Sequence, residues 1–241
     1  MEWTHVLLIA AGLWGLGAAT SEAPEGADPL VFYASQSGGP TLDRAAGGGN
    51  PFASALIELL ARDTLTVADL EDDLVALTRR KSRSFQVPEV ISGSGAETGA
   101  WQLKPVDPAG RRVALVFVFS NYGRAGTVSL SGAARDLKRV SRALRDAGFE
   151  VATLRDPSKE ELYDALDAFA ERSEDAEAAV LYMTGHGFER GREVYLAPSD
   201  TPFNSRLRTL PKRSIRVADL TRYLRAEASN LLFFGGCRSY K

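Results

Sequence analysis

Apolar residues follow two patterns along the chain, short uninterrupted runs and sets spaced three or four positions apart. Runs of roughly four to eight apolar residues that end in turn residues are typical of strands buried on both faces. The wider spacing is typical of one face of a helix. The runs that predict strands are residues 30–34, 113–119, 150–154, 178–184 and 231–234.

Helical spacing occupies the stretches between these runs. Pro51 starts one predicted helix, Thr66 with Asp69 and Ser158 with Glu161 resemble helix-starting capping boxes, and Gly148 ends a helix. Strands that alternate with helices predict an α/β fold, with a mainly parallel sheet covered by helices on both faces. The apolar helix positions are Leu56, Ile57, Leu59 and Leu60; Leu70, Leu74 and Leu77; Leu137, Val140 and Leu144; Leu162, Leu166 and Phe169; and Val217, Leu220 and Leu224.

The chain begins with a segment typical of a secretory signal peptide, predicted for residues 1–20. Its apolar part, residues 6–19, carries no charge and is shorter than the ~20 residues of a membrane span. Small residues at 17–19 suit signal-peptidase cleavage, although the first five residues lack Lys and Arg. We therefore expect an exported protein, periplasmic or secreted, with no stable membrane span after leader removal. A retained anchor and a plain N-terminal helix are the alternatives.

Composition limits the classes of protein that this chain can represent. It has 241 residues, of which 44% are hydrophobic and 25% charged, which suits one globular domain with a sizeable core. A formal net charge of −2 does not favour nucleic-acid binding, and a single cysteine excludes an internal disulfide framework.

Two further segments lack periodicity. Residues 21–29 are predicted to be a tether, and residues 91–111 a linker.

The candidate chemistry lies at the ends of two predicted strands. The chain has one cysteine, Cys237, and two histidines, of which His5 lies in the leader. Any Cys–His chemistry must therefore use Cys237 and His186. Each follows an apolar run and a glycine, and ligands of open α/β sheets bind beyond the carboxyl ends of strands. Taken singly, such a cysteine is more often a small buried hydrophobe, and a lone histidine is usually structural or exposed.

Several motifs together resemble the large-subunit half of a caspase-like peptidase, of the metacaspase or bacterial type. His186 lies about 50 residues before Cys237, which is the order and spacing of caspases. The stretch that carries the resemblance is residues 111–238, with a first strand at 112–122, the opening of the first helix at 130–136, the histidine motif at 184–187, the segment after it at 195–200 and the cysteine motif at 236–238.

The resemblance also implies an unusual chain order. Caspases have the His–Cys half first, whereas here residues 30–90 resemble the small-subunit half and precede it. The similarities are a strand at 32–34, an Asn-Pro-Phe helix start at 50–52 and a Gln-x-Pro sequence at 86–88. We interpret the chain as one circularly permuted caspase-like domain of three layers, in which residues 112–241 form the large-subunit-like half. A gene fragment, or the junction of two incomplete domains, is the alternative.

The family chemistry assigns roles to these residues. Cys237 would be the nucleophile, His186 the general acid and base, and the backbone N–H groups of Gly187 and Cys237 the oxyanion hole. Asp136 matches a family carboxylate that binds substrate. An unpaired carboxylate there favours substrates with Arg or Lys, rather than Asp, immediately before the cleaved bond. A second acid is usual where this chain has Gly235. Arg238 would either favour the thiolate or be merely exposed.

The resemblance thus predicts a cysteine endopeptidase that uses a Cys–His dyad and cleaves protein or peptide substrates after basic residues, with no nucleic-acid partner. A catalytically inactive caspase-like interaction module is the alternative. No obligatory cofactor or metal is expected. The acidic residues 71–73 are the one candidate for a calcium site, but they lie on a predicted helix and suit a solvated face. The sequence makes no prediction of oligomeric state.

Overall fold

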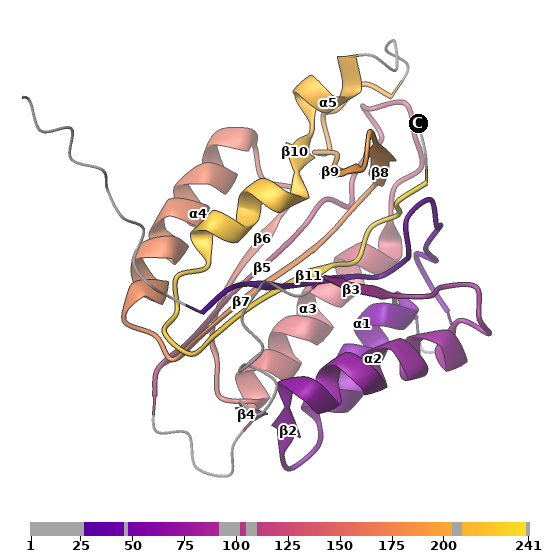
Figure 1. Ribbon diagram of the computed structural model, residues 1–241. Coiled ribbons are helices and arrows are strands. Elements are labelled where there is room, and N and C mark those ends of the chain that lie inside the picture. Colours follow the sequence, from indigo (N-terminus) through magenta and orange to yellow (C-terminus); the bar gives the residue numbers. More distant parts are fainter. Residues whose placement is uncertain (1–26, 46–47, 92–101, 105–109, 204–208, 240–241) are drawn as a thin grey trace, which may run out of the picture.

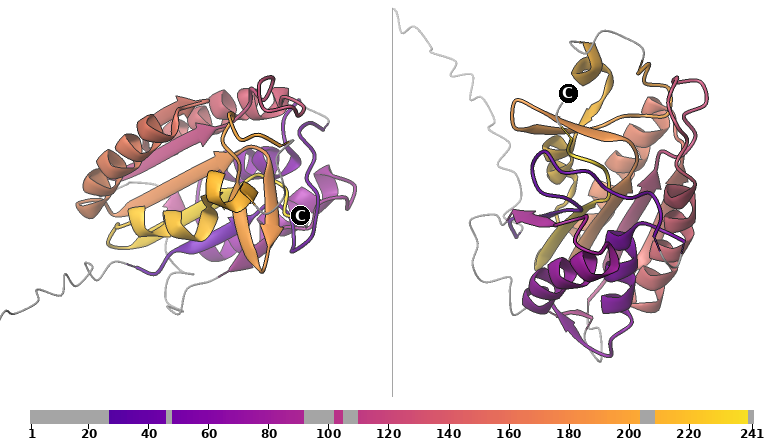
Figure 2. Two further views of the ribbon diagram at one scale, coloured as in Figure 1. Left: turned by 90° about the horizontal axis from the view of Figure 1, so that it is seen from above. Right: turned by 90° about the vertical axis from the view of Figure 1, so that its right-hand side faces the viewer.

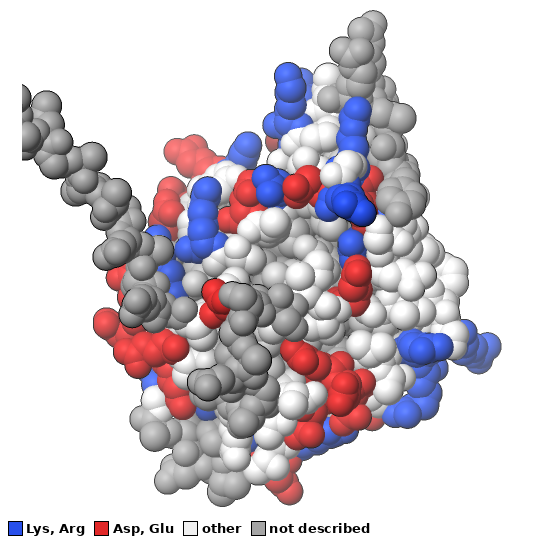
Figure 3. Space-filling model, viewed as in Figure 1, with Lys and Arg blue, Asp and Glu red and all other residues white. Residues whose placement is uncertain are grey.

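The computed structural model describes residues 27–45, 48–91, 102–104, 110–203 and 209–239. The predicted leader and most of the tether lie outside these residues. None of the helices in the described part of the chain has the length and apolar character needed to cross a membrane. Acidic and basic side chains are interspersed over the described part of the face in Figure 3, as the small net charge suggests.

A six-stranded sheet forms the centre of the fold, in the order β3-β1-β11-β7-β5-β6. Neighbouring strands run parallel except for β3, which pairs antiparallel with β1 at the edge. The central strands β5, β7 and β11 are buried along their whole length, and most of their residues are apolar because both faces of the sheet are covered. The strands are β1 (Leu30–Tyr33), β3 (Glu89–Ile91), β5 (Arg112–Val118), β6 (Glu150–Arg155), β7 (Ala178–Thr184) and β11 (Ser229–Phe234).

Helices cover both faces of this sheet and bury two separate apolar clusters (Figures 1 and 2). On one face, α1, α2 and α3 pack on alternate strand residues such as Phe32 and Phe233, whose rings stack with centroids 4.8 Å apart. On the other face, α4 and η3 pack on the intervening residues. This confirms the predicted α/β fold of three layers. The helices are α1 (Pro51–Leu60), α2 (Val67–Lys81), α3 (Ser131–Asp146), α4 (Lys159–Glu174), α5 (Leu210–Arg213) and the 3-10 helix η3 (Val217–Tyr223).

Side chains of the local sequence cap the starts of α1, α2 and α4, whereas α3, α5 and η3 have no such side-chain cap. The Thr66 hydroxyl accepts from the backbone of Asp69, and Ser158 forms a complete capping box with Glu161. Helix α3 has no side-chain cap of its own. The carboxylate of Asp43 replaces it, because it accepts hydrogen bonds from the first-turn N–H groups of Gly132 and Ala133 at 2.9 and 3.0 Å.

The predicted linker at residues 91–111 is wrong in part. Its described residues include the end of β3 and the strand β4 (Gln102–Lys104), which pairs with β2 (Leu65–Thr66). The buried guanidinium of Arg112 donates to the backbone carbonyls of Leu103 and Gln102 and so holds β4 in place. The helix predicted around residues 217–224 is also corrected in type, since η3 is a 3-10 helix.

The two ends of the chain meet in one sheet. Leu30 lies opposite Leu231 and Tyr33 opposite Phe234 in the parallel pair β1–β11, seen as indigo and yellow ribbons side by side in Figure 1. The N-terminal segment therefore supplies two strands, β1 and β3. They extend the sheet beyond β11, on the side away from β7. A smaller sheet beyond β7 contains β8 (Gly187–Arg190), β9 (Glu193–Leu196) and β10 (Ile215–Arg216).

Candidate active site

His186 and Cys237 follow the carboxyl ends of β7 and β11, which are neighbouring parallel strands. The segments stay together beyond the sheet, because the Glu189 N–H donates to the carbonyl of Ser239 at 3.2 Å. An added Cβ at Gly187 would lie 2.5 Å from the Cys237 carbonyl oxygen, so this close approach requires glycine. The structure thus brings the two predicted reactive segments into contact.

The ring of His186 is oriented by its surroundings. Its Nε2 lies 2.7 Å from the carbonyl oxygen of Val128. A carbonyl can only accept, so Nε2 carries hydrogen, and in the neutral ring Nδ1 is left able to accept a proton. The ring packs edge-on against Tyr122 and Phe203, with centroids 4.5 and 5.4 Å away. The Tyr122 hydroxyl also accepts from the His186 backbone N–H at 2.9 Å.

The loop that carries the Val128 carbonyl is anchored by Asp156. This carboxylate accepts from the backbone N–H of Ser120 and Asn121 at 2.6 and 2.9 Å, and from the Ser199 hydroxyl at 2.6 Å. Burial alone would raise the pKa of Asp156, but the hydrogen bonds from Ser199, Asn121 and Ser120 lower it below its usual value. The sequence analysis did not identify Val128, because its contribution is a backbone carbonyl, which has no side-chain signature. It did not identify Asp156 either.

Cys237 is half-buried, and its sulfur contacts a loop from the other end of the chain. The backbone N–H of Thr41 donates to Sγ at 3.2 Å, and the Thr41 hydroxyl oxygen lies 3.0 Å from Sγ. The thiol is therefore held by polar groups and is not sealed behind hydrocarbon. The sequence gives no signal that pairs Thr41 with the cysteine.

Comparison with known proteins identifies the family of this chain. Residues 111–241 match the model of the caspase domain family. The chain belongs to this family. The match includes β5 to β11, with His186 and Cys237, but not β1 or β3. A search of the curated proteins found no match. Membership of the caspase family suggests cysteine peptidase activity on protein substrates.

Arg238, the residue after the candidate nucleophile of this caspase domain, is turned into the interior. The residue is 5% exposed, and its guanidinium lies 3.1 Å from the carboxylate of Glu189, pairs with Glu89 and lies 4.4 Å from the ring centroid of Tyr33. Both expectations for Arg238 are corrected: it is not exposed, and its charge is paired with two carboxylates of β8 and β3 rather than with the sulfur.

Asp136 of the caspase domain is buried and has partners within the protein. Its carboxylate accepts from the backbone N–H of Asn50 and from the Arg139 guanidinium, both at 2.9 Å. The premise of an unpaired carboxylate is therefore wrong. Burial raises the pKa of Asp136 to about 6, against the opposing effects of the Asn50 hydrogen bond and of Arg139.

This raised pKa makes stability depend on pH. The folded state holds the proton of Asp136 more tightly than the unfolded state does. The contribution of this protonated carboxyl to the free energy of unfolding is therefore fully present below pH ~4 and is lost as the pH rises through ~6. Between pH 4 and 7 the wild type should lose ~2–3 kcal/mol more than an Asp136→Asn variant, which cannot ionise. Urea unfolding at both pH values measures this difference, and parallel profiles for the two proteins would contradict it.

A second carboxylate near the cysteine comes from Asp43 rather than from the position of Gly235. An added Cβ at Gly235 would lie 2.9 Å from the Thr184 hydroxyl, which leaves no room for an acidic side chain as the chain is folded. Asp43 lies two positions after Thr41, which contacts the sulfur, and its charge contributes to raising the pKa of Asp136. Sequence reasoning missed Asp43 because it approaches α3 from a distant loop.

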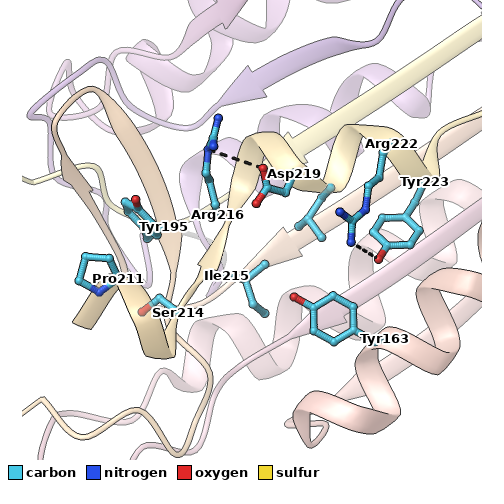
Figure 4. Close-up of a pocket in the computed structure, with 10 residues that line it drawn as sticks. Tyr163, Tyr195, Pro211, Ser214, Ile215, Arg216, Asp219, Arg222 and Tyr223 are labelled. Atoms are coloured by element: carbon cyan, nitrogen blue, oxygen red, sulfur yellow. Dashed lines mark hydrogen bonds and ion pairs between the residues drawn. The ribbon is translucent and has the colours of Figure 1, made fainter. Parts of the chain in front are cut away.

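A cavity of about 240 Å³ lies elsewhere on the caspase domain, between α4, β9, β10 and η3 (Figure 4). Its lining includes neither His186 nor Cys237. The charged groups in view are already paired: Arg216 lies 3.6 Å from Asp219, and Arg222 donates to the Tyr223 hydroxyl at 2.8 Å.

The acidic residues 71–73 lie on α2, and the described residues contain no cluster of three His, Cys, Asp or Glu that could hold a metal.

Proposed function

We propose that this chain is a cysteine endopeptidase with a Cys237–His186 dyad. The observation that carries the proposal is the meeting of the two segments at the carboxyl edge of β7 and β11, with Nε2 of His186 fixed on the Val128 carbonyl. This tautomer leaves Nδ1 as the proton acceptor that a thiol nucleophile requires.

The dyad would act in two steps. The Cys237 thiol passes its proton to Nδ1 of His186, and the thiolate attacks the peptide carbonyl carbon. The N–H groups of Gly187 and Cys237 would stabilise the oxyanion. His186 then gives the proton to the leaving amine as the C–N bond breaks. Water, deprotonated by His186, hydrolyses the thioester and restores the thiol.

Cleavage after basic residues is the specificity that we propose. Asp43 lies two positions after Thr41, and Asp136 is bound to Asn50, whose side chain donates to the Gly235 carbonyl before the cysteine. A guanidinium or ammonium group would pair with these two carboxylates. The Asp43 side chain is 26% exposed, which makes it the more accessible of the two. Asp136 would take part once Arg139, its present partner, is displaced or shared.

We also propose that the domain is circularly permuted. The matched segment, residues 111–241, lacks β1 and β3, and the preceding segment supplies these two strands to the same sheet. Buried Gln86 supports this, because it links the two ends of the small-subunit-like segment through hydrogen bonds to Leu42 and Ala34. Export to the periplasm or the medium is part of the same proposal, on the strength of the N-terminal segment alone.

A set of fluorogenic peptides that differ only in the residue before the cleaved bond tests the function. We expect Arg and Lys peptides to be hydrolysed at least ~10-fold faster than the Asp peptide, since ~1.4 kcal/mol is modest for a charge-assisted hydrogen bond. Cys237→Ala provides the background rate. If folded wild-type protein hydrolyses none of the peptides, the inactive interaction module becomes the better interpretation.

A further inference from the structure

The sulfur of Cys237 contacts two hydrogen-bonding groups on a single residue of a distant loop. The Thr41 backbone N–H donates to Sγ at 3.2 Å, and its hydroxyl oxygen lies 3.0 Å from Sγ. In the longer contact, of 3.8 Å, the Cys237 thiol donates to the Thr41 carbonyl oxygen. The N–H can only donate, whereas the hydroxyl can donate to a thiolate or accept from a thiol.

The position of Thr41 is fixed on both sides. On one side, the Gly39 carbonyl accepts from the backbone N–H of Arg238, next to the cysteine itself, at 2.9 Å. On the other, the Leu42 N–H donates to the side chain of fully buried Gln86 at 3.0 Å. Asp43 is bound in turn to the start of α3. These hydrogen bonds fix the loop independently of its contact with the sulfur, so Thr41 stays in position beside Cys237.

Hydrogen bonds to the charged form of an acid favour that form. The guanidinium nearest in sequence, on Arg238, is paired with Glu189 and Glu89, so the donors of Thr41 are the groups seen to contact Sγ. The segments around Cys237 also carry His186 on the β7–β8 connection, Asp43 and Arg44 on the same loop as Thr41, Tyr33 on β1, Asp136 and Arg139 on α3, Glu189 on β8 and Glu89 on β3.

We propose that Thr41 is a positioning residue that stabilises the thiolate of Cys237 and fixes the direction of its sulfur. The effect on thiol reactivity stands by itself, and its consequence for turnover rests on the proposed peptidase function. A group from the N-terminal segment would then complete the reactive centre of the C-terminal segment, which explains why the chain needs both in one fold.

The single cysteine makes this proposal directly testable, because alkylation of the folded protein by iodoacetamide reports on Cys237 alone. The variant Thr41→Val removes the hydroxyl but keeps the shape and the backbone N–H. We expect the pH midpoint of the alkylation rate to rise by about one unit, and the rate two units below it to fall about tenfold. Thr41→Ser should keep the wild-type midpoint, as should Thr64→Val at an exposed position outside the site.

An unchanged or lower midpoint in folded Thr41→Val would overturn the proposal, and faster alkylation would show that Thr41 merely covers the thiol. Peptide turnover separates this result from the fate of the proposed function. Turnover by the wild type with no shift in Thr41→Val refutes the role of Thr41 alone. A shifted midpoint in a protein that cleaves no peptide supports the role of Thr41 and refutes the peptidase.

Discussion

Replacing His186 by alanine is expected to lower kcat/KM for a cleaved peptide by about 10²–10⁴-fold, the range for removal of a general acid–base group. The variant loses the group that accepts the thiol proton and returns it to the leaving amine. The fold should survive, because the bond from residue 186 to the Tyr122 hydroxyl uses the backbone N–H, which alanine keeps. Steady-state kinetics and thermal unfolding of the same preparation measure both effects.

Cys237→Ala sets the lower limit of activity in this experiment. Buffer imidazole is a further control, since it can replace a missing side chain only if that side chain transferred protons. A folded His186→Ala protein that retains more than about a tenth of wild-type kcat/KM would remove His186 from the proposed dyad.

Replacing Arg238 by methionine should have the largest effect on stability, a loss of ~3–5 kcal/mol in the free energy of unfolding. Methionine fills similar space but leaves Glu189, which is 3% exposed, as an uncompensated buried charge. Leaving Glu89 without its partner would cost less, because 41% of its side chain is exposed to solvent. Urea unfolding at pH 7 measures the loss.

Two variants make this measurement specific to the buried ion pair. Arg142→Met is the matched control at an exposed position and should change stability by no more than ~0.5 kcal/mol. Adding Glu189→Gln to Arg238→Met should recover part of the loss, since the unpaired charge is then gone. Equal losses in Arg238→Met and Arg142→Met would show that the interior pairing contributes nothing.

The fold was predictable where the sequence is regular. Uninterrupted runs such as residues 113–119 and 231–234 correspond to central strands, because both faces of those strands are buried and every position is apolar. Local capping was equally visible at Thr66 and Ser158. Two short strands escaped prediction: β3 and β4 are three residues each, and pairing with β1 and β2 defines them rather than any pattern of their own.

The candidate site was predictable only in its reactive side chains. His186 and Cys237 follow strands that tertiary structure places side by side, and the family resemblance named them. The Val128 carbonyl, the donors of Thr41 and the Asp43 carboxylate act across long sequence separations, so no local pattern marks them. The pairing of Asp136 was readable, because Arg139 three positions later shares its helix face.

An Arg-containing acyloxymethyl ketone tests the shared site of Cys237 and His186 most directly, with intact-mass and peptide mapping of the product. The account predicts one adduct per wild-type chain, located on Cys237, and labelling slowed at least tenfold in His186→Ala. Absence of an adduct on folded wild-type protein, or equal labelling of the two proteins, would contradict it.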